Sequence, residues 1–151
     1  SHGGHRAAAG LTLEEKAVDA FRIDFCAFAE QQLGGEERIA ELFVDAETPL
    51  AALTHQTVQQ IESLAPFGHG NLRPMLCTSG VSLAEPPKRI GATGQHLSLR
   101  RAVAFGGAEW EAGLTATVGP LAVAFQPMIN HYRGRHTVEM RLADWRPQNG
   151  R

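Results

Sequence analysis

The spacing of the apolar residues changes at about residue 75, and this change constrains the fold more than any other feature. Before it, apolar residues recur at the three- and four-residue spacing of a helix. After it, they alternate with polar residues, as in strands that bury one face. The sequence therefore predicts an α+β chain with its helices first. Its 151 residues, 43% of them apolar, suffice to bury a core in one domain or two small ones.

A helix is predicted over residues 13–33. Thr12 and Glu15 have the spacing of a capping box, and Gly34 with Gly35 supplies a stop. The helix carries a stripe of phenylalanines that we interpret as core packing: Phe21, Phe25 and Phe28.

A short strand and a second helix are predicted next. Residues 39–47 alternate weakly, as in a strand, and Thr54 is a plausible N-cap for a helix that ends before Pro66. Residues 66–74 then hold several Gly and Pro, which predicts a rigid loop rich in turns.

Five short strands, with a helical turn at 108–113 after the third, are predicted in the second half. Gly134 can supply the positive φ of a tight hairpin between the last two. This arrangement favours a small OB-type Greek-key β-barrel preceded by two helices and a short strand. The strand segments are 75–83, 96–100, 102–105, 114–118 with 121–125, and 137–143.

The junction between Arg100 and Arg101 is unusual, because two strand patterns meet there without a turn residue. A single continuous strand would place Arg101 on the face of Leu99 and Val103. We therefore expect a hairpin loop whose residues are missing between Arg100 and Arg101.

Charge is divided between the two halves. Residues 1–72 hold four bases and eleven acids, a net −7, whereas residues 73–151 hold ten bases and five acids, a net +5. A basic half joined to an acidic half points to nucleic-acid contact, and an ordinary solvated surface is the alternative.

Several classes of site are absent from the sequence. The two cysteines make no disulfide scaffold, and no Cys/His cluster has zinc spacing. Phosphate-loop and nucleophile-elbow motifs are missing, and the acids of 73–151 are scattered. We expect neither a complete active site nor a bound metal or other cofactor in this chain. Residues 1–10 lack the apolar core of a signal peptide and no apolar run suits a membrane span, so we expect a cytoplasmic protein with no membrane partner.

The first residue, Ser1, is followed by a Gly-rich stretch, which we interpret as the interior of a longer protein, with a tag remnant as the alternative. Basic and aromatic residues on the polar side of the barrel are the candidate binding surface for a single strand. The alternative is that they only solubilise the strands. These residues are Lys88, Arg89, His96, Arg100, Arg101, Tyr132, Arg133 and Arg135.

Several segments resemble the RecJ family of exonucleases. Residues 64–74, LAPFGHGNLRP, are similar to a long Pro-Phe-Gly signature of that family, with Leu72 where the family pattern has proline. Gly3-Gly4-His5 resembles the GGH motif of the DHH-associated domain. Further similar segments are 96–99, 102–106, 129–130 and 133–135.

The resemblance implies a role in degrading single-stranded DNA, 5′ to 3′, in recombination and repair. Residues 1–37 would be the end of the DHH-associated domain, 38–147 the OB domain and 148–151 a tail. Gly3, Gly4 and His5 would contact substrate phosphates. Catalytic ligands for Mn²⁺ or Mg²⁺ would lie upstream, leaving this part inactive alone. Repair or replication proteins are further expected partners, and a docking module or a structural brace is the rival interpretation of the barrel.

Overall fold

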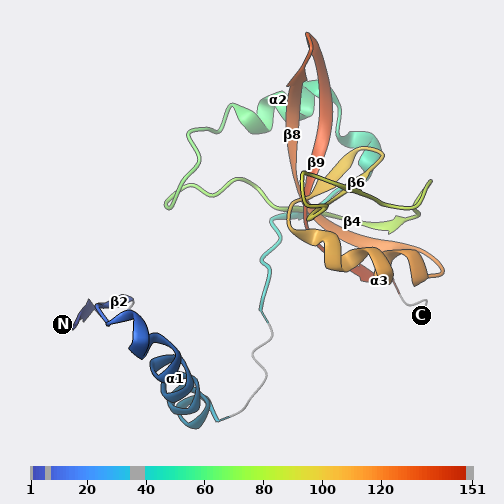
Figure 1. Cartoon of the computed structure of the whole chain (residues 1–151). Helices are drawn as coiled ribbons and strands as arrows, with labels where there is room; N and C mark the ends of the chain where they lie inside the picture. Colours follow the sequence, from blue (N-terminus) through green and yellow to red (C-terminus); the bar gives the residue numbers. More distant parts are fainter. Residues whose placement is uncertain (1, 6–7, 35–39, 149–151) are drawn as a thin grey trace. The chain divides into compact units, whose positions relative to one another are not determined.

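The computed structural model describes residues 2–5, 8–34 and 40–148, and the chain forms two compact units, 1–41 and 42–151 (Figure 1). The boundary expected between residues 37 and 38 lies outside the described residues, as does most of the expected tail at 148–151. Within those residues, no helix is both long and apolar enough to cross a bilayer.

The first unit is a β-hairpin followed by a helix. Strands β1 (His2–His5) and β2 (Ala8–Leu11) pair antiparallel, a hairpin that we did not predict. A short 3-10 turn, η1 (Glu15–Ala17), leads into α1 (Val18–Leu33). Gly34 ends the helix at φ 71°, as predicted, because glycine adopts a left-handed conformation without steric cost.

The prediction that the α1 phenylalanines pack in a core is wrong within the described residues. Phe25 and Phe28 are 57% and 60% exposed, and no residue of α1 is buried. Phe21 stacks on Phe25 at 5.5 Å between ring centroids, so the stripe contacts itself.

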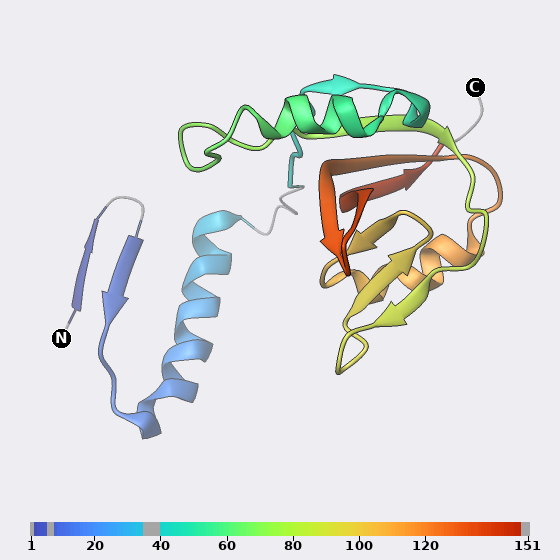
Figure 2. The ribbon, with the colours of Figure 1, turned by 90° about the horizontal axis from the view of Figure 1, so that it is seen from above.

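The second unit begins with the elements that flank the barrel. These are β3 (Ala46–Glu47), much shorter than the predicted strand, then the 3-10 turn η2 (Leu50–Ala52) and α2 (His55–Glu62). Thr54 caps α2 as predicted, since its hydroxyl accepts a hydrogen bond from the Thr57 amide at 3.1 Å. At the other end of α2, Glu62 Oε1 accepts from the Ile129 amide at 3.1 Å. The helix is thereby fixed along β8, described next (Figures 1 and 2).

The barrel has the strand connections of an OB fold, as predicted. Its sheet runs β3-β4-β8-β9-β7-β6-β5, and β7 pairs parallel with β9 while the other barrel strands pair antiparallel. Strands β4 and β5 follow one another along residues 76–90, so this stretch closes the sheet into a barrel. The strands are β4 (Leu76–Val81), β5 (Lys88–Ile90), β6 (His96–Leu99), β7 (Ala102–Ala104), β8 (Leu121–Tyr132) and β9 (Arg135–Pro147).

A helix replaces the strand predicted at 114–118. A 3-10 turn, η3 (Gly107–Glu109), continues into α3 (Trp110–Ala116), whose Leu114 is buried in the core. Gly113 lets α3 lie close to the barrel, because a Cβ there would meet Trp145 Cζ2 at 2.8 Å. The alternation of Leu114, Ala116 and Val118 was misleading, since only Leu114 faces the core and Val118 is fully exposed.

The junction at Arg100 is a two-residue turn. Leu99 pairs with Ala102, so Arg100 and Arg101 alone connect β6 to β7. The turn supplies the chain reversal that the sequence pattern lacked, and the expectation that residues are missing there stays a prediction. The turn also corrects the continuous-strand alternative, because the chain reverses and Arg101 does not share a strand face with Leu99. The core of the barrel is apolar and centres on Phe125, Leu97, Leu114, Leu121 and Leu142.

Candidate nucleic-acid interface

The tip of the β8–β9 hairpin carries one group of predicted binding residues. Tyr132 pairs with Arg135, and Arg133 and Gly134 form the turn at φ 48° and 74°. This is the two-residue turn that glycine at 134 predicted. The Arg133 guanidinium lies over the Tyr132 ring at 5.2 Å from its centroid. The hairpin projects beyond the rest of the barrel (Figure 1), so these side chains are presented to solvent.

The β6–β7 turn adds two more arginines to the same side of the barrel. Arg100 and Arg101 line a hollow together with His55 and His136. The Arg101 carbonyl accepts a hydrogen bond from the Met140 amide at 2.9 Å, which fixes the turn against β9. His136 directly follows Arg135, so the hollow adjoins the hairpin. We call this set the basic band: Arg100, Arg101, Arg133, Arg135 and His136.

The arginines of the basic band have no acidic partner in the part of the chain that is described: none of the ion pairs among residues 40–148 includes them. Their charge is therefore available to an anionic ligand. An exposed cation stays hydrated and surrounded by counterions in the free protein. When a nucleic acid binds, its phosphates replace that water and those counterions.

Lys88 and Arg89, expected in a loop, lie instead on the edge strand β5. Lys88 Nζ is 3.3 Å from Glu85 Oε2, and Arg89 Nε is 2.5 Å from Glu111 Oε2. Arg89 also donates to the Ala108 carbonyl at 3.3 Å. The contacts of Arg89 join β5 to the region of α3, and both cations already have partners within the fold.

An exposed aromatic ring lies at the end of β7, and sequence reasoning missed it. Phe105 is 54% exposed, the His96 ring meets it edge-on at 5.2 Å, and the Arg141 guanidinium lies over it at 5.4 Å. His96 Nδ1 accepts a hydrogen bond from the Gly106 amide at 2.9 Å, so His96 is oriented by the backbone. In the predicted strand 102–105, Phe105 shares a face with Val103. The glycine pair after it was the available signal that the strand ends first.

The Gly3-Gly4-His5 motif forms β1 in the first unit, where all three residues are exposed. Gly4 faces β2 so closely that a Cβ would lie 2.9 Å from the Ala9 Cβ. A packing requirement thus explains Gly4 within the hairpin itself. In the described ranges, no three His, Cys, Asp or Glu side chains gather in a way that could hold a metal ion.

The Pro-Phe-Gly loop is held by its own contacts. Asn71 Nδ2 donates to the carbonyls of Leu64 at 2.9 Å and Pro66 at 3.0 Å, while Arg73 lies over the Phe67 ring at 4.4 Å. Gly68 and Asn71 also exchange backbone hydrogen bonds. These contacts within the loop agree with the turn-rich segment that the sequence predicted, and Arg73 joins it to Glu62 of α2 at 3.8 Å.

The model of the RecJ OB domain matches residues 44–144, which is most of the second unit and includes the basic band and Phe105. The chain belongs to the RecJ OB domain family. Two proteins with the name single-stranded-DNA-specific exonuclease RecJ match over nearly its whole length. The protein from Thermus thermophilus is 28% identical over 149 residues and that from Bacillus subtilis 25% identical over 150.

These matches cover 96% and 94% of the chain, but only 21% and 19% of the relatives. The chain thus spans about a fifth of the length of the curated RecJ proteins that it matches. Crystal structures of Thermus thermophilus RecJ with Mn²⁺ and with Mg²⁺ superimpose with TM-scores of 0.64 and 0.61. Sequence identity is 25% and 24%, and the matches cover 99% of the chain and 22% and 23% of RecJ. The RecJ resemblance and the OB fold predicted from the sequence are confirmed.

The metals in those RecJ structures do not have a matching site among the described residues. Mg²⁺ prefers a near-octahedral set of oxygen ligands, and Mn²⁺ suits the same ligands. The acids that line hollows together with Arg100 and Arg101 already have partners: Glu139 accepts a hydrogen bond from Asn130 at 2.8 Å, and Glu85 lies 3.3 Å from Lys88 Nζ. No step of metal chemistry is therefore assigned to this RecJ region.

Proposed function

We propose that this chain is the strand-holding region of a RecJ-type exonuclease and binds single-stranded DNA through its barrel. The observation that carries the proposal is the exposed ring of Phe105, with Arg141 beside it, on a barrel whose hairpin and turn arginines have no acidic partner in the described fold. Single-strand binding needs bases stacked on aromatic rings and phosphates held by cations, and both are sequence-tolerant. The family membership and the names of the curated relatives support it.

In the whole protein, we place this region beside a Mn²⁺- or Mg²⁺-dependent centre that degrades single strands 5′ to 3′ in recombination and repair, in the cytoplasm. Gly3, Gly4 and His5 are proposed to contact substrate phosphates, since all three residues are exposed and the ring of a histidine can donate a hydrogen bond to an anion. Within the barrel, the basic band holds the phosphates and Phe105 stacks a base. His96 acts by positioning Phe105 and Arg141 extends the cationic surface.

The test is fluorescence anisotropy of labelled oligo-dT with the full 151-residue chain over a salt series. We expect binding that weakens steeply with salt, because phosphate contacts release counterions. Phe105→Ala should weaken binding about tenfold, since one stacked base contributes about 1–3 kcal/mol. Phe43→Ala is the matched control, because Phe43 is another exposed phenylalanine of the second unit and lies outside the proposed site.

Loss of binding in both phenylalanine variants, or in neither, argues against the platform. Absence of binding by the unchanged chain at low salt would favour a docking module or a structural brace. We also expect the chain alone to leave DNA intact with Mn²⁺ or Mg²⁺. Degradation that survives further purification would contradict the assignment of the catalytic ligands to the rest of the protein.

A further inference from the structure

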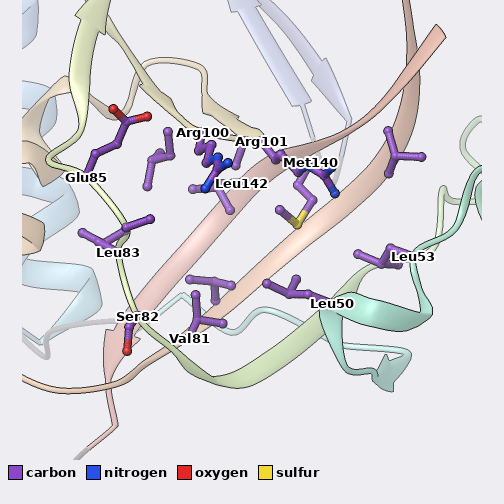
Figure 3. A pocket seen from close by; sticks show the side chains of 15 residues that line it. Leu50, Leu53, Val81, Ser82, Leu83, Glu85, Arg100, Arg101, Met140 and Leu142 are labelled. Carbon is purple, nitrogen blue, oxygen red and sulfur yellow. The ribbon is translucent and has the colours of Figure 1, made fainter.

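Three of the seven histidines lie in a row at one side of the second unit. His55 begins α2, His131 lies near the end of β8, and His136 lies near the start of β9. His55 and His136 line a hollow together with Arg100 and Arg101, and the same two arginines border the larger, mostly apolar cavity of Figure 3. The proposed DNA site uses only His136 of these three histidines.

His131 and His136 are directly opposite each other across the β8–β9 hairpin. The next pair toward the turn, Tyr132 and Arg135, closes a two-residue loop, and such a closing pair exchanges both of its backbone hydrogen bonds. The histidines are then a non-hydrogen-bonded pair, the kind in which facing side chains lie closest. Their ring centroids are 4.3 Å apart, with 66° between the ring planes. The hairpin therefore holds two imidazoles side by side on one face.

The separation of the two rings is close to that of two imidazoles on one metal ion. An imidazole nitrogen lies about 2.0–2.1 Å from a bound Zn²⁺, which places the ring centre about 3.2 Å from the ion. Two such rings at right angles about the ion have their centres about 4.5 Å apart, and a tetrahedral pair has them about 5.2 Å apart. The observed 4.3 Å is near the first value, so a small rotation of the two side chains suffices.

Both rings are available to a ligand. His131 and His136 are exposed, and no hydrogen bond or ion pair among the described residues engages either ring. His96, in contrast, uses Nδ1 to accept a hydrogen bond from a backbone amide at 2.9 Å. His2 and His5 are three residues apart in β1, so they point to opposite faces of that strand. The two strands of the hairpin thus bring together a pair of donors that the spacing within one strand does not provide.

We propose that His131 and His136 together bind a divalent transition-metal ion that favours imidazole nitrogen, such as Zn²⁺. Imidazole suits Zn²⁺, Ni²⁺ and Cu²⁺, whereas Mg²⁺ and Mn²⁺ favour oxygen ligands. Two protein ligands are fewer than the three or four of a resident zinc site, so water fills the other positions and the ion exchanges with solution. This agrees with the lack of any group of three possible ligands in the described ranges. The site goes beyond the proposed DNA binding and does not depend on it.

The neighbouring arginines oppose the binding of any cation. Arg100 and Arg101 line the hollow with His136, and Arg133 lies in the hairpin turn. All three are exposed, so water and salt screen their repulsion, whereas the metal contacts the histidine nitrogens directly. Two protons are a poorer alternative to one ion, because two charged rings at 4.3 Å would repel each other. A bound ion joins β8 to β9 near the hairpin tip and adds two positive charges to the basic band.

The experiment follows the imidazole Cε1–H NMR signals of the full chain during a titration with Zn²⁺. We expect the signals of His131 and His136 to shift together and to saturate, while the signal of the exposed His69 stays in place. Mg²⁺ at the same concentration should shift none of them. Because this titration uses the unchanged chain, its result does not depend on the folding of any variant.

Isothermal titration calorimetry then compares variants. His131→Gln or His136→Gln should each lower the zinc affinity about tenfold or more, because the second tethered ligand acts at a high effective concentration. His69→Gln, at an exposed position of the Pro-Phe-Gly loop, is the matched control and should leave the affinity unchanged. His55→Gln should have a much smaller effect than His131→Gln, since the His55 and His136 ring centroids are 6.4 Å apart.

A zinc-induced shift of only one of the two ring signals, or of neither, would overturn the proposal. So would an equal shift with Mg²⁺, or equal zinc affinities of His131→Gln and His69→Gln. A loss with His55→Gln as large as with His131→Gln would overturn the cross-strand pair in favour of a site between α2 and β9. Zinc binding by a chain that does not bind oligo-dT would instead defeat only the proposed function.

Discussion

The barrel presents two pairs of cations in opposite circumstances. On β5, Lys88 and Arg89 each contact a carboxylate, and Arg89 Nε lies 2.5 Å from Glu111. On the β8–β9 hairpin, Arg133 and Arg135 contact no acid in the described part of the chain. Both pairs look alike in the sequence, and both were predicted to bind nucleic acid.

The difference shows that the number of cations in a segment does not give the number that are free to contact a phosphate. A cation engaged by a neighbouring carboxylate must lose that partner before it contacts a phosphate, whereas a free cation loses only water and counterions. We therefore expect the hairpin to dominate DNA binding and β5 to contribute mainly to the fold. Four substitutions test this comparison.

The largest effect is expected for Arg133→Ser combined with Arg135→Ser. The loss of two phosphate contacts made by these unpaired arginines should weaken oligo-dT binding about tenfold at low salt. It should also reduce the slope of log affinity against log salt by about 1.4. Anisotropy across the salt series measures both. Thermal unfolding should stay close to that of the unchanged chain. A fall in affinity with no change in the slope would show that these residues act through the hairpin shape instead.

Gly134→Ala tests whether the hairpin must hold its shape. At φ 74°, a residue with a Cβ is strained by about 1 kcal/mol, so the free energy of unfolding should fall by that amount. Gly134→Asn is the control, because asparagine tolerates this conformation better. Denaturant unfolding followed by tryptophan fluorescence measures the difference. Equal stability of the alanine and asparagine variants would contradict the strained turn.

Lys88→Ser with Arg89→Ser removes the same formal charge from β5. Oligo-dT affinity should change less than about twofold, and stability should fall by less than about 1 kcal/mol, because both ion pairs are largely exposed to solvent. The two double variants should be titrated side by side at one salt concentration. An equal loss of DNA affinity in the two double variants would contradict the proposed difference between the β5 cations and the hairpin cations.

Glu111→Gln should give the smallest effect and the opposite sign. It removes the carboxylate beside Arg89 and leaves that cation free, so oligo-dT affinity at low salt should rise, by less than about twofold. Adding Arg89→Ser to the same chain should cancel the gain. A gain in affinity that persists without Arg89 would mean that Glu111→Gln acts only by lowering the negative charge of the surface.

Local signals in the sequence predicted much of the barrel. Thr54 caps α2 and Gly134 forms the hairpin turn, because each requirement is met within a few residues. The strand at 114–118 failed for a tertiary reason. Leu114 enters the core from a helix that Gly113 brings against Trp145, a residue far along the chain. Alternation over five residues carries no information about such a partner.

The candidate site was predicted less well than the fold. The arginines of the basic band could be identified by type, but which cations have acidic partners depends on the fold. Glu111 of α3 and Glu85, which precedes β5, pair with Arg89 and Lys88 instead. Phe105 and Arg141 lie far apart in the sequence and meet because β7 pairs parallel with β9. Such a pair is created by the barrel topology and has no signature in either segment.

The position of β9 between β7 and β8 has a consequence for folding. Barrel strands β4 to β8 are synthesised before β9, yet β7 and β8 are joined only through it. Until residues 135–147 have left the ribosome, the apolar faces of β7 and β8 have no closed barrel to enter. Closure is therefore a late step. It includes the pairing of β7 with β9, two segments distant in the sequence, and such pairing is slow. A nascent chain stalled before β9 would expose a sheet edge, and this is where a chaperone would find its binding site.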